Sequence, residues 1–533
     1  MRRLLIIVLC MAVLALVVAI PIARRHLHEE AGMTNRHGVR ATLAAIGAML
    51  AGSQSTAALA VPPTTIGVNL SQPSYFRKTR SLANLAAASN WYAPDHHPIG
   101  PDEVDNDGNV IKLAPGATLS RMMTPPNPSA KGAPIRCTWQ GKGSFKPAGN
   151  RFQDLQTTAN SFTFNLRGDP ATRTGSVELR LSAIDPADPI RNIDCRETTL
   201  PANAAFDPKY VESLRGFKVI RFMDWQASNA NAPVTWATLH RRTSIDTMQH
   251  DGVAIEDMVE LTKATNADPW FTMPWNGDDD YFERFARMVH DNVPADRTVY
   301  VELGNEIWNR AFKAARQAQE EGLAAGLTSD PNQAGLFRYA QRLAHVLDIW
   351  KRVYADRPGR LVRVAACQNG DRCAKIVLGY QDTAKHIDAL ATAPYFGGRL
   401  GRTTFTSVDE IFTALDPEVD RTLALALQAK AVASQYGKRY IAYEGGQHLI
   451  FRDVELLQRV ERDPRMYSAY KKYLSTWRSQ IGDTIALFNS SYPIGPFGAW
   501  GLVEYMGQPL SEAPKMRAVQ EAIDAENGGR ASR

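Results

Sequence analysis

The chain has 533 residues, of which 44% are apolar and 22% are charged, and its formal net charge is only +6. This is the composition of an ordinary globular protein with ample apolar residues for a core. The length allows two or three average domains, or one large barrel with an insertion. Because the net charge is small and no basic stripe is interleaved with aromatic residues, the sequence argues against nucleic acid as a partner.

The first 60 residues predict export rather than a folded domain. Residues 4–23 form an almost unbroken apolar run flanked by arginines, long enough to span a bilayer as a helix. From Met33, a basic segment, an apolar run and Ala58-Leu59-Ala60 follow in the order of a signal peptide and its cleavage site. Either residues 4–23 are a membrane anchor, or Met33 is the true start and residues 33–60 are a signal peptide; we favour the second interpretation. Both predict a secreted or periplasmic protein, and the first adds a tether to the inner membrane.

The cysteines agree with export. Beyond Cys10 in the apolar run, four cysteines remain, an even number that predicts two disulfides in an oxidising compartment. We expect the pairs to be Cys137–Cys195 and Cys367–Cys373; the alternative is four reduced, buried thiols. The Cys and His spacings typical of metal sites are missing, so we expect no metal.

The first predicted strand, Thr65–Leu70, is separated from the next by a segment of different character. Residues 105–204 are rich in Pro, Gly and Thr and contain alternating runs at Ser161–Leu166 and Ser176–Ser182. Alternation of this kind is typical of antiparallel strands. We therefore expect a small β-domain at 105–204, inserted after the first barrel strand and a linker at 61–104. The alternative is a separate N-terminal β-domain, with the first barrel strand elsewhere.

From residue 205 to residue 525, short β-branched runs alternate with amphipathic stretches, which predicts a parallel α/β fold. Seven strands are expected, at Lys218–Met223, Pro269–Pro274, Val299–Leu303, Leu361–Ala366, Ile387–Thr392, Arg439–Tyr443 and Thr484–Phe488. Helices are expected at Ile255–Ala264, Tyr281–Val293, Arg421–Tyr436 and Met466–Ile481, and a long helix places Phe337, Ala340, Leu343, Leu347 and Trp350 inward. With Thr65–Leu70 as the eighth strand, the fold class is a (β/α)₈ TIM barrel, followed by a tail at 526–533.

Two glutamates end strands of this barrel. Asn305-Glu306 follows the fourth strand, and Glu444, with two glycines after it, follows the seventh. The carboxyl ends of barrel strands share one rim, where barrel active sites lie. A single glutamate at a strand end is most simply a solvated residue. Two carboxyls across a cavity, however, suit cleavage of a glycosidic bond.

In these residues the chain resembles the clan A glycoside hydrolases, retaining glycosidases on a TIM barrel, of cellulase-like or arabinofuranosidase-like type. The resemblance covers about residues 205–510 and the first strand. It implies that Glu306 is the general acid/base, that Glu444 is the nucleophile and that Asn305 binds the sugar 2-hydroxyl. A retaining pair would place its carboxyl groups roughly 5–5.5 Å apart.

The same resemblance suggests further substrate-binding residues. Arg221 in the second strand would hold the nucleophile as an anion; the alternative is a structurally paired barrel arginine. Tyr395 matches a tyrosine that bonds the nucleophile, although the family's histidine two residues earlier is Ala393 here. Trp500 is the first choice for a sugar-stacking ring and Trp275 the second, among four tryptophans at strand ends that include Trp225 and Trp308.

Asp224, Asn276 and His448 also lie at or just past strand ends, where they would contact hydroxyl groups; otherwise they cap helices or have no role. The sequence thus predicts an exported retaining hydrolase of a β-linked poly- or oligosaccharide, without metal or organic cofactor. A non-catalytic carbohydrate-binding barrel and a transglycosylase acting on an envelope or extracellular polysaccharide are the alternatives. The sugar, the linkage and the choice between endo and exo action stay open.

Overall fold

The computed structural model describes residues 61–531, except for 78, 96–98, 101, 124–132, 168–176 and 246–251. Residues 61–533 belong to one structural unit. The predicted anchor at 4–23 and signal peptide at 33–60 lie outside the described residues. Among the helices that are described, none has the length and hydropathy to cross a bilayer.

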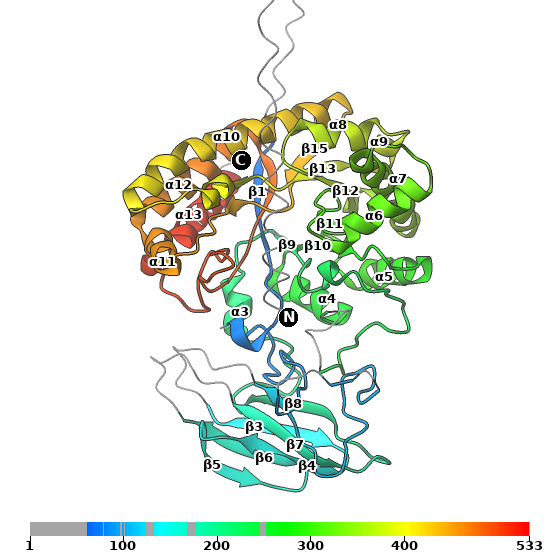
Figure 1. The fold of residues 1–533 in the computed structure, drawn as a ribbon, viewed down its shortest axis with the longest axis vertical. Coiled ribbons are helices and arrows are strands. Elements are labelled where there is room, and N and C mark those ends of the chain that lie inside the picture. Colours follow the sequence, from blue (N-terminus) through cyan, green and yellow to red (C-terminus); the bar gives the residue numbers. More distant parts are fainter. Residues whose placement is uncertain are drawn as a thin grey trace, which may run out of the picture. The chain divides into compact units, whose positions relative to one another are not determined.

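Eight parallel strands close into a barrel, as predicted (Figure 1). Around the barrel the order is β1, β17, β15, β13, β12, β11, β10 and β9, and β1 pairs with both β17 and β9. Each strand overlaps a predicted one. Their bounds are β1 Thr64–Asn69, β9 Val219–Arg221, β10 Asp268–Met273, β11 Val299–Leu303, β12 Leu361–Cys367, β13 Ala389–Thr392, β15 Arg439–Ala442 and β17 Asp483–Leu487.

Helices follow most of these strands and surround the barrel (Figure 1). They are α3 Pro208–Ser213, α4 Ile255–Thr265, α5 Asp279–Asn292, α6 Lys313–Ala324, α7 Pro331–Val353, α8 Asp371–Gly379, α9 Thr383–His386, α10 Val408–Gln435, α11 Val454–Arg462, α12 Pro464–Thr476 and α13 Pro514–Ala531. Two boundaries differ from expectation. Helix α10 begins at Val408 rather than Arg421, because Ser407 caps it and Pro417 lies inside the helix without ending it. Helix α13 continues to Ala531, through most of the predicted tail.

Alternation along the strands divides their side chains between two cores. One cluster fills the barrel interior and includes Val219, Trp270 and Tyr300; the other packs the outer faces of the strands against the helices. Successive side chains of a strand point to opposite faces, so a residue two positions further along points the same way. Arg221, Thr272 and Glu302 therefore also point into the barrel, one layer nearer its carboxyl rim.

The segment between β1 and β9 folds into two antiparallel sheets, which confirms the predicted insertion after the first strand. The sheets have the strand orders β2-β7-β4 and β5-β6-β3-β8, and aromatic residues such as Trp139, Phe145 and Phe162 form a separate core with them. The bounds are β2 Leu119–Met122, β3 Ile135–Gln140, β4 Gly143–Ala148, β5 Phe152–Thr157, β6 Ser161–Leu166, β7 Glu178–Ile184 and β8 Arg191–Glu197. The domain limits at 105 and 204 stay predictions.

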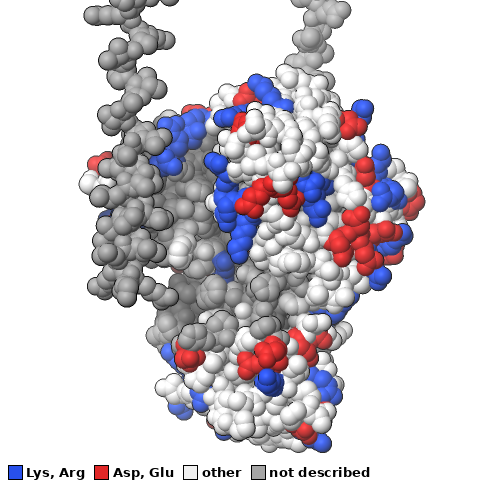
Figure 2. Space-filling view, turned by 45° about the vertical axis from the view of Figure 1, so that its right-hand side comes forward, with Lys and Arg blue, Asp and Glu red and all other residues white. Residues whose placement is uncertain are grey.

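Charged side chains of both signs are intermixed on the surface. On the face in Figure 2, small groups of Lys and Arg lie directly beside groups of Asp and Glu. Many form pairs, for example Arg363 with Asp388 and Arg338 with Glu321, both at 2.8 Å. The surface in this view is thus not a field of one sign.

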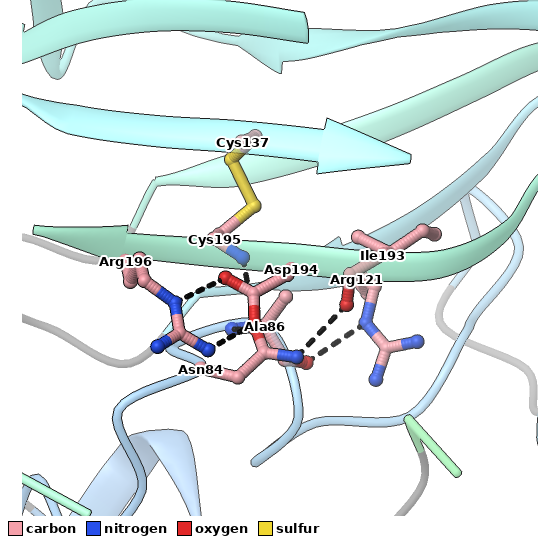
Figure 3. Close-up of a disulfide and its surroundings, with 8 residues drawn as sticks. All are labelled: Asn84, Ala86, Arg121, Cys137, Ile193, Asp194, Cys195 and Arg196. Carbon is pink, nitrogen blue, oxygen red and sulfur yellow. Dashed lines mark hydrogen bonds and ion pairs between the residues drawn. A yellow bond between two sulfur atoms is a disulfide. The ribbon is translucent and has the colours of Figure 1, made fainter. Parts of the chain in front are cut away.

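Both predicted disulfides are present. Cys137 on β3 lies opposite Cys195 on β8 and is bonded to it, and Cys367 is bonded to Cys373. Figure 3 shows that Asn84 lies against β8 beside the first disulfide. Its side-chain oxygen accepts a hydrogen bond from the Cys195 amide at 3.0 Å, and its amide group donates to the carbonyl of Ile193 at 2.8 Å.

The two connections between the insertion and the barrel run side by side. Leu82 and Phe206 form an antiparallel bridge, the Ala83 amide donates to the Ala205 carbonyl at 2.9 Å, and the Asp207 amide donates to the Ser81 carbonyl at 3.1 Å. The chain therefore leaves the barrel and returns to it at one place.

Candidate active site

Glu306 and Glu444 lie on the same rim of the barrel. Glu306 follows β11 and Glu444 follows β15, at the carboxyl ends of these parallel strands. Both side chains are buried, with 9% and 4% of their surface exposed. The chain turns sharply after β11, where Gly304 has φ of 63° and Glu306 itself has φ of 50°. Left-handed backbone is uncommon for a residue with a side chain and occurs often at functional sites.

Arg221 connects the layers below this rim. Its fully buried guanidinium donates to Oε1 of Glu444 at 2.7 Å and to Oε1 of Glu302 at 2.7 Å. It also donates to the side-chain oxygens of Asn69 at 2.8 Å and Asn305 at 3.1 Å. One arginine thus holds four groups from three strands, β1, β11 and β15, and its cation lies directly against the carboxylate predicted to be the nucleophile.

Glu444 is also held from its other oxygen. The hydroxyl of Tyr395, on β14 (Tyr395–Phe396), donates to Oε2 of Glu444 at 2.9 Å. With Arg221 on Oε1 and Tyr395 on Oε2, the orientation of this carboxylate is fixed. The predicted neighbours Arg221, Asn305 and Tyr395 therefore all lie together at Glu444.

Glu306 has a different environment. Oε2 accepts from the side-chain amide of Asn309 at 2.7 Å, and Oε1 faces the Tyr443 hydroxyl at 3.4 Å. Tyr443 in turn accepts a hydrogen bond from the indole N–H of Trp308 at 3.0 Å. Burial, and then the negative charge of Glu444, raise the pKa of Glu306 to about 7. A carboxyl with this pKa carries a proton near neutrality and can donate it.

The charges around Arg221 explain why the pKa of Glu306 is raised. Glu302, Glu306 and Glu444 are three buried carboxyls near Arg221. The Arg221 guanidinium forms ion pairs with Glu302 and Glu444. A third buried negative charge would have no cation beside it, so ionisation is least favourable at Glu306. Burial also raises the pKa of Glu302, although Arg221 and Thr272 oppose this shift.

A fourth carboxyl, Asp224, lies near Glu444. Burial, and to a smaller extent the Glu444 charge, raise the pKa of Asp224 to about 6, whereas the cation of Arg77 opposes the shift. Asp224 follows β9 at its carboxyl end and so lies at the same rim; its contact with sugar hydroxyls stays a prediction.

Trp500 and His448 form an aromatic group with Tyr395, beside Glu444. The ring centroids of Trp500 and His448 are 4.5 Å apart, and that of Tyr395 lies 5.7 Å from Trp500 and 5.4 Å from His448. Trp500 is half-buried, and its N–H donates to the Phe497 carbonyl at 2.8 Å. Burial lowers the pKa of His448, so its ring is neutral at pH 7.

Trp275 and Asn276 belong to a different network. Only 1% of Trp275 is exposed, and its N–H donates to Glu321 at 3.4 Å. Asn276 bonds the backbone carbonyl of Asn231 and the side chain of Gln317. A stacking ring must present a free face, so the burial of Trp275 does not fit the stacking role predicted for it, and Trp225 is likewise buried in the core. The sugar contact predicted for Asn276 stays a prediction.

Several residues of the cluster were missed by the sequence prediction: Asn69, Thr272, Glu302, Asn309 and Tyr443. Each has a polar side chain that either points into the barrel like that of Arg221, by strand alternation, or lies within a few residues of Glu306 or Glu444 in the sequence. Glu302 stands four positions before Glu306 and two after Tyr300, so strand alternation alone places it inside the barrel. Within the described part of the chain, no group of three His, Cys, Asp or Glu side chains is arranged to hold a metal ion.

No protein-family model matches the chain, and no curated protein matches it. Among solved structures, an arabinofuranosidase of family GH51 from Xanthomonas axonopodis pv. citri is 12% identical, with a TM-score of 0.36 over 56% of this chain and 62% of that one. A β-glucosidase from Thermotoga maritima is 12% identical, with a TM-score of 0.35 over 59% and 85% of the two chains. A 4-O-α-L-rhamnosyl-β-D-glucuronidase from Fusarium oxysporum is 9% identical, with a TM-score of 0.38 over 59% and 63%.

The match thus spans less than two thirds of the arabinofuranosidase chain. The likeness to glycoside hydrolases concerns the fold, and the roles of individual residues rest on the geometry described above.

Proposed function

We propose that this protein is a retaining glycoside hydrolase of β-linked poly- or oligosaccharides, with Glu306 as general acid/base and Glu444 as nucleophile. One observation carries the proposal: two buried carboxyls share the carboxyl rim of a barrel, one held by Arg221 and Tyr395 and the other with its pKa raised to about 7, chiefly by burial. A proton donor and an anionic nucleophile are the two groups that this reaction needs.

In the first step, Glu306 protonates the glycosidic oxygen while an oxygen of Glu444 attacks the anomeric carbon. The bond between that carbon and the leaving oxygen breaks, and a glycosyl ester of Glu444 forms. Arg221 and Tyr395 hold the attacking carboxylate in place. We assign the binding of the hydroxyl next to the reacting carbon to Asn305, whose side-chain oxygen accepts a hydrogen bond from Arg221.

In the second step, Glu306 accepts a proton from water, which attacks the anomeric carbon and releases Glu444. The charge coupling favours this change of role. The anionic charge of Glu444 raises the pKa of Glu306, and the ester intermediate has lost that charge. The pKa of Glu306 therefore falls between the steps, which leaves the carboxylate that the second step requires.

The proposal is tested by assaying wild-type protein on a panel of aryl β-glycosides and α-L-arabinofuranosides, with NMR of the product anomer. We expect retained configuration, and loss of turnover by at least about a thousandfold in E444Q. E306A should lose less activity on aryl glycosides, whose leaving groups need no proton, and azide should restore it by forming a glycosyl azide. Glu320 is an exposed glutamate on α6, so E320Q is the matched control.

Other outcomes distinguish the alternatives. Inverted configuration in the product would contradict the retaining mechanism. Glycan binding without turnover would identify a non-catalytic binding barrel. Transfer of the sugar to an added acceptor in preference to water would identify a transglycosylase.

We further propose that the protein acts outside the cytoplasm, on a carbohydrate partner there. The two disulfides support this compartment. The test is a fusion of residues 1–60 or 33–60 to a reporter that is active only after export, with the mature N-terminus determined by mass spectrometry. A reporter inactive in both fusions would contradict export, and retention of residues 4–23 in membranes would favour the anchor.

A further inference from the structure

A second feature of the barrel rim is a cavity of about 210 Å³ beside Glu306. Its walls come from the residues that follow Glu306, from α6, from the first turns of α7, and from Gln368 after β12 together with the first turns of α8. Tyr395, His448 and Trp500, which surround Glu444, are not among its lining residues. The cavity therefore lies on the Glu306 side of the carboxyl pair.

The cavity is connected to Glu306 through Trp308. This half-buried ring is part of the wall, and its N–H donates to the Tyr443 hydroxyl, which faces Oε1 of Glu306. In the proposed reaction, Glu306 protonates the leaving oxygen. A sugar residue in the cavity would thus belong to the leaving group, on the far side of the bond from the residue attached to Glu444.

Two arginines give the cavity its chemical character. Arg310 and Arg372 line it, and no acidic side chain does. Within the described residues, neither guanidinium forms an ion pair or donates a hydrogen bond. Many other arginines are paired with carboxylates, for example Arg338 with Glu321 and Arg363 with Asp388. Two guanidinium groups without partners at one concave site favour an anionic ligand, because each can form charge-assisted hydrogen bonds to it.

The remaining lining suits a sugar that carries the anion. The amide side chains of Gln319, Asn332 and Gln368 are donors and acceptors for hydroxyl groups, and Trp308 offers an apolar ring edge or face. The Cys367–Cys373 disulfide ties the end of β12 to the first turn of α8 and closes the segment that carries Gln368 and Arg372, and Cys373 itself lines the cavity. A covalently closed loop holds these side chains in place before a ligand arrives.

We infer that this cavity is a subsite for an anionic sugar residue on the leaving-group side, bound through Arg310 and Arg372. The shared chemistry is a carboxylate or an ester sulfate on a pyranose ring. The assignment to the leaving-group side rests on the proposed function, whereas binding of the anion does not.

The test uses the full-length E444Q variant, which binds without turnover, and matched β-linked oligosaccharides in neutral, hexuronate and O-sulfated forms. Calorimetry measures each Kd. We expect an anionic form to bind at least about tenfold more tightly than its neutral counterpart, with the preference falling as salt rises. R310A and R372A should each remove about tenfold of that preference and leave the neutral ligand unchanged.

Arg352 provides the control, because it is an exposed arginine near the other end of α7. R352A should keep the preference, and R372K should retain part of it, because lysine keeps the charge and loses the planar pair of donors. Thermal unfolding of each variant verifies the fold. Quenching of Trp308 fluorescence, compared with W308F, reports whether the ligand is in the cavity.

The uronate and sulfate arms show which anion is preferred. Equal binding of neutral and anionic ligands, or a preference that R310A and R372A do not change, would overturn the inference. Hydrolysis of aryl glycosides by the wild type in that case would leave the proposed function standing. Arginine-dependent binding of anions by a protein without turnover would instead contradict the hydrolase and support the subsite.

Discussion

Glu306 and Glu444 are the same amino acid on the same rim, and only their neighbours distinguish them. Glu444 has a cation on one oxygen and a hydroxyl on the other. Glu306 has an amide and a distant hydroxyl, with the charge of Glu444 nearby. The position of one buried arginine, against Glu444, therefore gives the two carboxyls different electrostatic surroundings.

The pH dependence of activity follows from this difference. Glu306 must be protonated for the first step, and its pKa is about 7. We expect kcat/KM to fall as pH rises through about 7, because the acid is progressively lost. The measurement is a pH profile of kcat/KM on the best substrate. In E306A assayed on an activated aryl glycoside the alkaline limb should vanish, and its persistence would assign the limb to another group.

Glu306 should also lower stability at alkaline pH. Its folded-state pKa of about 7 lies above the unfolded value of about 4.3. The protonated folded form is favoured, so this contribution to stability is complete below about pH 4 and is lost as pH rises through 7. E306Q cannot ionise. We expect it to be more stable than the wild type by on the order of 2 kcal/mol at pH 8, and by much less at pH 4.

Urea unfolding at the two pH values measures this difference. E320Q, at an exposed position, should show little change at either pH. A gap between E306Q and the wild type that is equally large at pH 4 and pH 8 would show that the effect is not due to ionisation of Glu306.

At the scale of elements, the two disulfides close loops of very different length. Cys137 and Cys195 are 58 residues apart, and Cys367 and Cys373 are 6 apart. Loop-closure entropy predicts that removing the first lowers the free energy of unfolding by about 4 kcal/mol and removing the second by about 2 kcal/mol. Paired Cys→Ala variants in urea unfolding test this order, and the reverse order would contradict it.

The barrel elements could be predicted because each strand is a short apolar run bounded by turn residues. The start of α10 could not be predicted so well, because Pro417 usually ends a helix, whereas here it lies inside one. For the site, a position at a strand end pointed to Glu306 and Glu444, and the resemblance to clan A glycoside hydrolases pointed to Tyr395. The position could not show that Trp275 turns into the core, nor that Glu302 lies within the barrel, since a sequence position does not give the direction of a side chain at a strand's end.

At the scale of the molecule, the insertion follows β1, whose carboxyl end is on the catalytic rim. Loop residues after β9, which leave the same rim, contact it. The amide of Ile245 donates to the Asp107 carbonyl at 2.9 Å, and Arg121 donates to the Ile245 carbonyl at 2.8 Å. Ile245 belongs to the core of the insertion. The insertion is therefore tied to the barrel on the side where the carboxyl pair lies.

Because Leu82 and Phe206 form a bridge, the two chain segments that connect the insertion to the barrel could be joined directly at this point. A short Gly-Ser link between residues 83 and 205 would remove the whole insertion without moving a barrel strand, because the two ends are already hydrogen-bonded neighbours. We expect the shortened protein to keep a folded barrel by circular dichroism and turnover of small aryl glycosides, while Ile245 loses its cover. Failure to fold would show that the insertion is needed for closure. If the barrel folds, the insertion is an exchangeable module, and sheets of other sequence could be placed at the rim of the unchanged barrel where Glu306 and Glu444 lie.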